Sequence, residues 1–287
     1  HSGYIKSQPL SEYRAQKRGG RGKQATATKE DDWIDQLFIA NTHDYILCFT
    51  NRGRVYWLKV WHIPQGSRTA KGRPLVNLLP LADSERVTAI LPIRTYEEDR
   101  FVFMATANGT VKKTPLEQFS RPRSAGLIAL ELDEGNTLIG AALTDGQCDV
   151  LLLTSSGKAA RFAESDVRAM GRTARGVRGI ALRGEQRVIA LIIPRADGFV
   201  LTASARGYGK RTPVDEFPRK GRGTPGVIAM QTSERNGRLV AATQVATTDE
   251  LMFMSSSGTL VRTRAEEISV LGRNTQGVRL IRLDEGE

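Results

Sequence analysis

Two series of glycines recur six times along this chain of 287 residues. Members of the first series follow a short apolar run and lie 48 to 56 residues apart: Gly3, Gly53, Gly109, Gly157, Gly207 and Gly258. Members of the second series follow their partners by 19 residues, or by 17 in the third copy: Gly22, Gly72, Gly126, Gly176, Gly226 and Gly277. A fixed period of this length predicts a repeat architecture in which each unit packs on its neighbours.

A third register supports the repeat. An apolar side chain lies ten residues beyond each glycine of the first series: Tyr13, Ile63, Phe119, Val167, Phe217 and Ile268. The three registers predict a single domain over residues 1–287, built from repeats of approximately 1–50, 51–106, 107–154, 155–204, 205–255 and 256–287. The first and last repeats are incomplete, because each lacks one expected strand.

Each repeat has the pattern of β-structure. We expect strands before the first glycine (Asp149–Thr154, Phe199–Ala203) and after it (Thr110–Thr114, Leu260–Thr263). A third run follows the second glycine, at Leu127–Leu132, Val177–Leu182 and Val278–Leu283. A fourth strand (Leu138–Leu143, Val188–Ile193) is expected to form a hairpin with the next unit across the Asp-Gly turns at 145–146 and 197–198. Four strands per repeat predict an all-β, six-bladed, propeller-like fold, as a closed ring or an open spiral.

Composition narrows the class of partner. Lys and Arg outnumber Asp and Glu by 42 to 31, and the resulting net charge of +11 favours a polyanion. Cys48 and Cys148 lie in apolar runs, which predicts buried free thiols in a reducing compartment. No apolar run approaches the roughly 20 residues that span a bilayer. We therefore expect a cytoplasmic protein with no membrane contact.

Basic loops precede the second glycine of each repeat. The fullest copy, Gln16–Lys23, holds four cations and three glycines in eight residues, with no carboxylate. Glycines allow a close backbone approach, and Lys and Arg bind phosphate oxygens. The later copies are Arg68–Arg73, Arg121–Gly126, Arg172–Gly176, Arg219–Gly226 and Gly272–Gly277. Equivalent loops lie at equivalent heights on every blade, so these cations are expected to form a belt around the perimeter.

Other interpretations of the loops exist. Arg-Gly-Gly runs also occur in disordered RNA-binding tails, and Lys and Arg are common in solvated surface loops. The recurrence at one position of the repeat favours a polyanion track, as does the location of the acidic clusters elsewhere. Few aromatic residues lie beside the loops, so base stacking on single strands is not indicated. Double-stranded DNA, wrapped with little sequence specificity, is the expected partner.

The segment Gln16–Gly22 resembles the GyrA box of the family of bacterial DNA gyrase A subunits, with Lys17 in place of the usual Arg. The segments Gly3–Ala15, Ala40–Asp44, Met104–Thr114 and Gly272–Val278 are also similar to that family, so the resemblance covers essentially the whole chain. It implies a C-terminal domain with the β-pinwheel fold, whose four-stranded blades exchange a strand with their neighbours.

The resemblance also implies a function. The domain would wrap DNA in a positive, right-handed sense and present a segment for strand passage, so that the holoenzyme introduces negative supercoils with ATP hydrolysis. The box residues implied to bind DNA are Gln16, Lys17, Arg18, Gly19, Gly20, Arg21 and Gly22. The cations expected to bind DNA on the rim are Lys23, Arg68, Lys71, Arg73, Arg121, Arg123, Arg172, Arg175, Arg178, Arg219, Lys220, Arg222 and Arg273.

Catalysis is not expected from this fragment. In the family, the cleavage tyrosine and the ATP site lie elsewhere in the holoenzyme, which the resemblance describes as an ATP-dependent type II topoisomerase. No catalytic residue, metal ligand or cofactor is predicted here, and His1, His43 and His62 show no ligand spacing. The implied partners are the gyrase B subunit, with the cleavage core of the gyrase A subunit, in an A2B2 assembly associated with the bacterial nucleoid. The fragment alone is expected to be monomeric.

Three alternatives remain open from the sequence. The C-terminal domain of the topoisomerase IV A-type subunit has a similar fold, but it typically carries a degraded box and often fewer blades. A propeller used as a protein-interaction scaffold would have an incidental basic surface and no steep salt dependence of DNA binding. An enzymatic propeller such as a glycosidase would need paired carboxylates, and no acidic residue recurs at the strand starts.

Overall fold

The computed structural model describes residues 4–9, 39–67, 70 and 72–284, and within them it is all-β. Its strands are β1 (Tyr4–Ile5), β2 (Tyr45–Thr50), β3 (Arg54–Lys59), β4 (Arg73–Pro74), β5 (Val87–Ile93), β6 (Phe101–Thr106), β7 (Thr110–Pro115), β8 (Leu127–Ile128), β9 (Leu138–Thr144), β10 (Asp149–Thr154), β11 (Lys158–Ala163), β12 (Val177–Arg178), β13 (Val188–Ile192), β14 (Phe199–Ser204), β15 (Tyr208–Pro213), β16 (Val227–Ile228), β17 (Leu239–Val245), β18 (Glu250–Met254), β19 (Leu260–Arg264) and β20 (Val278–Arg279).

Short 3-10 turns are the only helical elements of the described residues. They are η2 (Val60–His62), η3 (Leu75–Asn77), η4 (Leu116–Phe119), η5 (Glu164–Asp166), η6 (Val214–Glu216) and η7 (Ala265–Glu267). Five of them follow the second strand of a hairpin and end beside the apolar residue of the third sequence register. Ile63, Phe119, Val167, Phe217 and Ile268 are all buried there. No helix in this part of the chain is long and apolar enough to cross a membrane.

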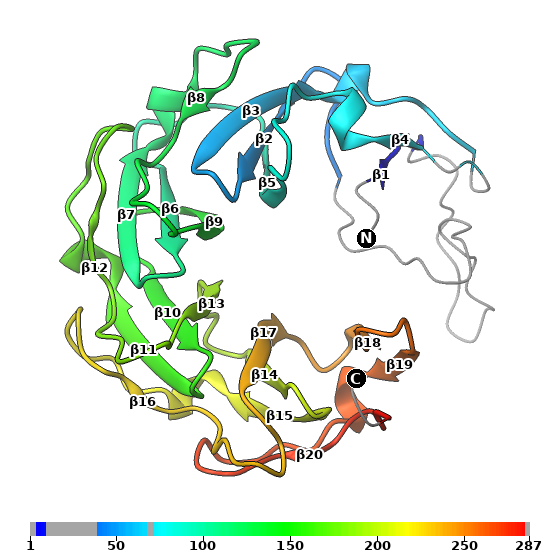
Figure 1. Ribbon diagram of the computed structural model, residues 1–287. Helices are drawn as coiled ribbons and strands as arrows, with labels where there is room; N and C mark the ends of the chain where they lie inside the picture. Colours follow the sequence, from blue (N-terminus) through cyan, green and yellow to red (C-terminus); the bar gives the residue numbers. More distant parts are fainter. Residues whose placement is uncertain (1–3, 10–38, 68–69, 71, 285–287) are drawn as a thin grey trace.

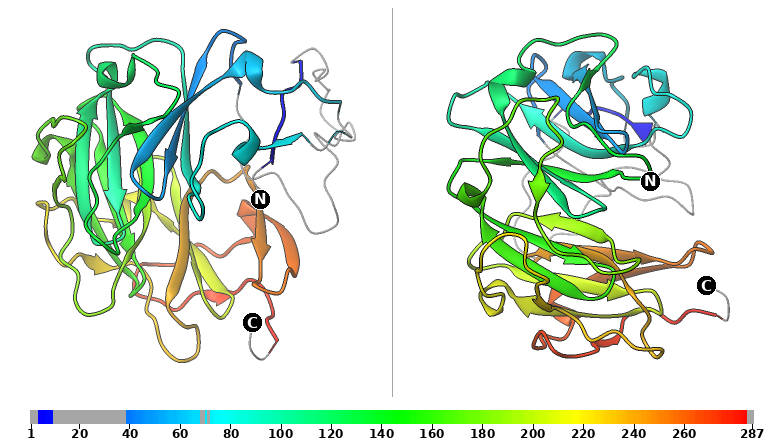
Figure 2. Two further views of the ribbon diagram at one scale, coloured as in Figure 1. Left: turned by 45° about the horizontal axis from the view of Figure 1, so that its top comes forward. Right: turned by 60° about the vertical axis from the view of Figure 1, so that its left-hand side comes forward.

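Six sheets follow one another around an arc (Figure 1). Blade 1 is the pair β1-β4, and blade 6 is the pair β18-β19. Between them lie four four-stranded sheets: blade 2 (β5-β2-β3-β8), blade 3 (β9-β6-β7-β12), blade 4 (β13-β10-β11-β16) and blade 5 (β17-β14-β15-β20). Two further views show the same succession around one axis as the colour passes from blue to red (Figure 2). Among the described residues, no strand pairing joins blade 1 to blade 6.

The outer strand of each complete blade comes from the next repeat. β8 follows Gly126 of the third repeat, yet it pairs with β3 of the second, and β12, β16 and β20 repeat this arrangement one unit later each time. This exchange confirms the pinwheel that the family resemblance implies. It also places every described basic loop immediately before a strand at the perimeter (Figure 1).

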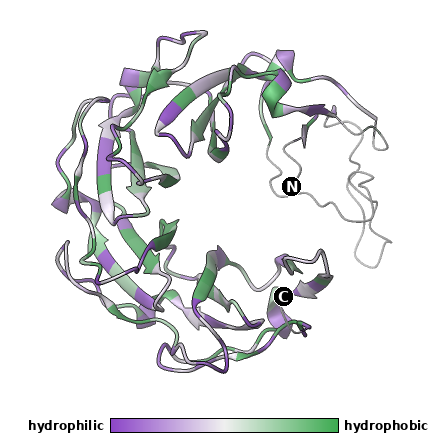
Figure 3. Ribbon diagram, in the orientation of Figure 1, coloured by the Kyte–Doolittle hydropathy of each residue, from purple (hydrophilic) through white to green (hydrophobic). Residues whose placement is uncertain are grey.

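The cores lie between successive blades. Alternate residues of a central strand face opposite neighbours: Val102 and Met104 of β6 pack with Leu47 and Phe49 of blade 2. Phe103 of the same strand packs on the other side, against blade 4. Because both faces of each sheet are covered, the central strands are continuously apolar, whereas the perimeter connections are mostly hydrophilic (Figure 3).

The recurring glycines allow the exchanged segments to pack closely against the blades. Every described member of both series has a positive φ, for example +79° at Gly157 and +82° at Gly226. The Gly157 carbonyl accepts hydrogen bonds from Ala229 and Met230 of the exchanged segment, at 2.8 and 3.2 Å. A Cβ on Gly157 would overlap the Met230 carbonyl oxygen, so a side chain is excluded by conformation and by space.

Two expectations about strands were wrong. The run after the second glycine forms only two residues of strand. In the third repeat, the N–H groups of the next two residues, Ala129 and Leu130, both donate to the Gly53 carbonyl, and the chain turns there. The fourth strand does not form a hairpin with the next unit: β9 pairs with β6 of its own blade, and the turn at 145–146 connects two sheets. β10 is unavailable to β9, because β11 and β13 pair with its two edges.

Candidate nucleic-acid interface

Basic loops occur once per repeat at the junctions between blades. Each described loop runs from the end of a 3-10 turn to a two-residue perimeter strand. Near their starts, the fourth, fifth and sixth loops are tied to the blade before them by the parallel bridges Lys113–Ala169, Arg161–Arg219 and Arg211–Val270. These three loops are therefore held at corresponding positions on successive blades, as the repeat predicts.

The box and part of the second loop lie outside the described residues. These positions are Gln16, Lys17, Arg18, Gly19, Gly20, Arg21, Gly22, Lys23, Arg68 and Lys71. Their DNA-binding role stays a prediction from sequence.

Five predicted rim cations are exposed and free of side-chain hydrogen bonds and ion pairs within the part of the chain that the structure describes. They are Arg73, Arg121, Arg123, Arg178 and Lys220. Arg73 and Arg178 lie in β4 and β12, and Arg121, Arg123 and Lys220 lie in the loops that precede β8 and β16. No ion pair neutralises these five cations within the described residues. These five cations are the most available for a polyanion.

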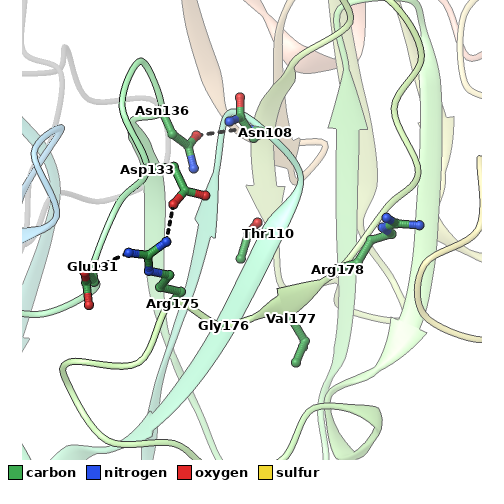
Figure 4. Close-up of a pocket in the computed structure, with 9 residues that line it drawn as sticks. All are labelled: Asn108, Thr110, Glu131, Asp133, Asn136, Arg175, Gly176, Val177 and Arg178. Atoms are coloured by element: carbon green, nitrogen blue, oxygen red, sulfur yellow. Dashed lines mark hydrogen bonds and ion pairs between the residues drawn. The ribbon is translucent and has the colours of Figure 1, made fainter.

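The other rim arginines have partners within the protein. Arg175 pairs with Asp133 at 2.7 Å and Glu131 at 3.1 Å, across a shallow polar depression that Asn108, Asn136 and Arg178 also line (Figure 4). Arg219 pairs with Asp149 at 3.3 Å. The sequence correctly shows no carboxylate inside these loops, but folding brings carboxylates from other segments beside them. Both arginines are more than half exposed, so such pairs are weak and can exchange for phosphate.

Three rim arginines make hydrogen bonds to the backbone. Arg222 donates to the carbonyl oxygens of Arg178 and Asp166, the latter at 3.2 Å. Arg273 donates to Ile228 at 2.9 Å, and Arg172 to Ile128 at 3.4 Å. These contacts fix side chains along the perimeter and leave each guanidinium with its charge and further donors.

Buried lysines lie beneath alternate loops. Lys112, with no exposed surface, donates to the carbonyl oxygens of Arg172 at 2.6 Å, Gly171 at 3.0 Å and Ala174 at 3.2 Å. Lys210, equally buried, donates to the carbonyl oxygens of Gly272 at 2.7 Å and Arg273 at 2.6 Å.

Lys6 makes the corresponding contacts in the second loop, to Ser67 at 3.0 Å and Ala70 at 2.7 Å. We call Lys6, Lys112 and Lys210 the anchor lysines. All three lie three residues after a glycine of the first series, in the first, third and fifth repeats. The second and fourth repeats have Tyr56 and Ala160 at this position, so only alternate described loops are anchored in this way.

Burial has an electrostatic consequence for two of the anchor lysines, Lys112 and Lys210. It is the main cause that lowers the pKa of Lys112 to about 7, and the nearby Arg172 charge contributes to the same shift. Burial likewise lowers the pKa of Lys210 to about 8, against the opposing effect of Glu216. The sequence analysis missed these residues. Their signal in the sequence was a lysine three residues after the first-series glycine in the first, third and fifth repeats.

The comparisons with known proteins agree with this geometry. A family model described as DNA gyrase C-terminal domain, beta-propeller, matches residues 1–41, 44–94, 100–145, 149–195, 198–246 and 249–287. The DNA gyrase A subunit of Klebsiella oxytoca is 60% identical over all 287 residues, and that of Escherichia coli K12 is 58% identical over the same length. The chain spans 33% of the length of each of these relatives.

Two solved structures are similar in fold. A crystal structure of the C-terminal domain of DNA topoisomerase IV superposes with a TM-score of 0.85 at 26% identity, covering 98% of this chain and 86% of that one. A DNA gyrase A C-terminal domain superposes with a TM-score of 0.75 at 25% identity, covering 99% and 94%. The family model matches nearly the whole chain in six segments, and the sheets exchange strands as that fold requires. The chain therefore belongs to the DNA gyrase C-terminal domain family.

Proposed function

We propose that this chain binds double-stranded DNA along its perimeter and wraps it in a positive, right-handed sense. The observation that carries the proposal is the recurrence of exposed cations in equivalent loops, once per repeat, along a curved edge. Bending 20–30 base pairs by 40–90° costs on the order of 1–6 kcal/mol. Phosphate contacts at regular intervals release counterions and offset that cost without reading bases.

The two relatives compared above are A subunits of DNA gyrase. On that basis we propose that the chain serves a type II topoisomerase made from the gyrase B subunit together with the cleavage core of the gyrase A subunit. The wrapped DNA would present a segment for strand passage, so that the assembly introduces negative supercoils. ATP and Mg2+ would act elsewhere in the assembly, and this chain would contribute binding and direction rather than catalysis.

The salt dependence of binding tests the proposal. The logarithm of the association constant for a linear duplex should fall linearly with the logarithm of salt concentration, with nearly the same slope for unrelated sequences. A shallow slope would fit the scaffold alternative and contradict DNA wrapping.

A second experiment tests the box. Replacing Lys17, Arg18 and Arg21 with Ala in the full-length protein should abolish supercoiling by the holoenzyme and leave relaxation of supercoils intact. Supercoiling that persisted in this variant would refute the proposed role of the box.

The similarity to a topoisomerase IV domain, at a TM-score of 0.85, supports a second candidate function, that of a topoisomerase IV DNA-binding domain. A domain of that class with a degraded box would bind DNA without a strong positive wrap. Measuring the linking number of DNA closed on the protein separates the two functions.

A further inference from the structure

Three potential metal ligands meet at one end of blade 4. Asp145 lies in the turn between β9 and β10, Cys148 immediately precedes β10, and Glu164 opens η5. The β10–β11 register pairs Asp149 with Ala163, so Cys148 and Glu164 are the next opposed residues. One ligand atom of each of the three residues lies within 4.8 Å of the others, and Cys148 Sγ lies 3.1 Å from Asp145 Oδ1.

Glu164 is unusual for its place in the repeat. The residues that open the corresponding turns η4, η6 and η7 are Leu116, Val214 and Ala265, all apolar and buried. Glu164 is equally inaccessible, with no exposed surface. A carboxylate at a buried apolar position is unfavourable unless its oxygens are satisfied.

One oxygen of Glu164 is satisfied and the other is not. Oε1 accepts a hydrogen bond from the Cys148 N–H at 2.8 Å. Oε2 is buried and has no hydrogen-bond partner among the described residues. Lys113 donates to the backbone carbonyl of Glu164 at 3.3 Å and lies over the Phe101 ring, and no ion pair with the Glu164 carboxylate is formed among the described residues. The Glu164 carboxylate therefore has one oxygen without a hydrogen bond, and it lies in a cluster with a thiol and another carboxylate.

We propose that Asp145, Cys148 and Glu164 bind a divalent cation of the zinc class. A thiolate ligand selects Zn2+ and similar borderline or soft ions over Mg2+ and Ca2+, which prefer oxygen alone. Zinc takes sulfur at about 2.3 Å and carboxylate oxygen at about 2.0–2.2 Å in a tetrahedron, which leaves a fourth position for water. Asp145 Oδ1 accepts a hydrogen bond from the Gln147 N–H at 2.9 Å, which holds its carboxylate beside the Cys148 thiol, and the hairpin holds Cys148 beside Glu164.

Binding would release the Cys148 thiol proton to solvent as the sulfur–metal bond forms. It would also connect the segment that leaves blade 3 to the hairpin of blade 4. The sequence analysis predicted no metal ligand, because it looked for histidine spacing. Glu164 lies 16 residues from Cys148 in sequence, and only the hairpin register brings the two together.

Titration of the full chain with Co2+, a spectroscopic substitute for Zn2+, tests the proposal. One equivalent should produce thiolate-to-cobalt absorption that Zn2+ abolishes by displacement. Cys148→Ala should remove the absorption, although Cys48 remains. Asp145→Asn and Glu164→Gln should each weaken binding at least tenfold, and the matched control Asp197→Asn, in the corresponding turn of the next repeat, should leave it unchanged. Absence of the band, or its persistence in Cys148→Ala, would overturn the proposal.

A stability measurement guards against variants that fold poorly. Glu164→Val introduces the residue found at the corresponding Val214, so it should fold. Saturating Zn2+ should raise the urea midpoint of the wild-type chain and leave that of Glu164→Val unchanged, since only the native wild-type site binds the ion. Equal shifts in both proteins, or no shift in either, would contradict a metal site at Glu164.

Discussion

The anchor lysines Lys112 and Lys210 donate hydrogen bonds to backbone carbonyls of the basic loops at the blade junctions. A buried ammonium is costly to desolvate, and several carbonyl acceptors at 2.6–3.2 Å offset part of that cost. The loop backbone is thereby fixed while its arginines remain near the surface. We infer that these lysines position the interface rather than contact DNA themselves.

The lowered pKa of Lys112 predicts a pH-dependent stability. The pKa is about 7 in the folded chain and about 10.4 in an unfolded one, so between these values the unfolded state binds more protons. The free energy of unfolding should therefore rise with pH in this window, by up to about 2 kcal/mol between pH 7 and pH 9 from this group. Urea midpoints of the wild type and of Lys112→Met measure it. If the free energy of unfolding rose equally with pH in both proteins, Lys112 would not be the group responsible.

The free and paired rim arginines should contribute differently to DNA binding. Replacing Arg121 and Arg123 with Ala should reduce the magnitude of the logarithmic salt slope by about 2, since each phosphate contact contributes about 0.9. Arg175→Ala should change it by less than one, because Arg175 must first leave Asp133 and Glu131. Arg100→Ala, outside the basic loops, serves as the control. A salt slope unchanged by the double substitution would show that the third basic loop, Arg121–Gly126, does not contact DNA.

At the scale of elements, the glycine in the turn of each central hairpin allows the exchanged strand to pack against that turn. Gly157 combines a positive φ with close contact to the Met230 carbonyl. Gly258 of blade 6 has a φ of +98° but nothing within 4 Å of an added Cβ. A side chain at Gly258 would therefore meet only conformational strain, whereas a side chain at Gly157 would meet both strain and steric overlap.

Substitution by alanine should distinguish these two costs. Gly258→Ala should lower the free energy of unfolding by roughly 1–2 kcal/mol, from the left-handed conformation alone. Gly157→Ala should cost roughly 1–3 kcal/mol more, because the exchanged segment must move to relieve the overlap. Urea denaturation of both variants measures the difference. Equal losses would show that the carbonyl contact does not limit the junction.

The sequence predicts these elements unevenly, for physical reasons. Strand β10 matches its predicted bounds, Asp149–Thr154, because continuous apolar residues and a following glycine turn are local signals. The partner of β9 is not local: a turn at 145–146 looks the same whether it joins paired strands or two blades. The pairing of Arg175 with Asp133 and the meeting of Cys148 with Glu164 likewise depend on register between distant segments. Among the described site residues, the sequence predicts which loops are basic but not which cations remain free.

At the scale of the whole molecule, the described sheets form an arc with their exchanged strands outside (Figure 1). β5, β9, β13 and β17 neighbour one another on the inner side, so the apolar blade junctions hold the curvature. A duplex following the perimeter would meet one basic loop at each junction. Curvature and basic loops thus lie along the same edge of the molecule, as the proposed wrapping requires.

The most direct test of the account is ligation of nicked circular DNA in the presence of the chain, followed by separation of the topoisomers. The account predicts that the linking-number distribution shifts in the positive direction as protein is added, up to a plateau, and that raising the salt concentration abolishes the shift. An unchanged distribution at protein concentrations that saturate the DNA would contradict wrapping by this chain.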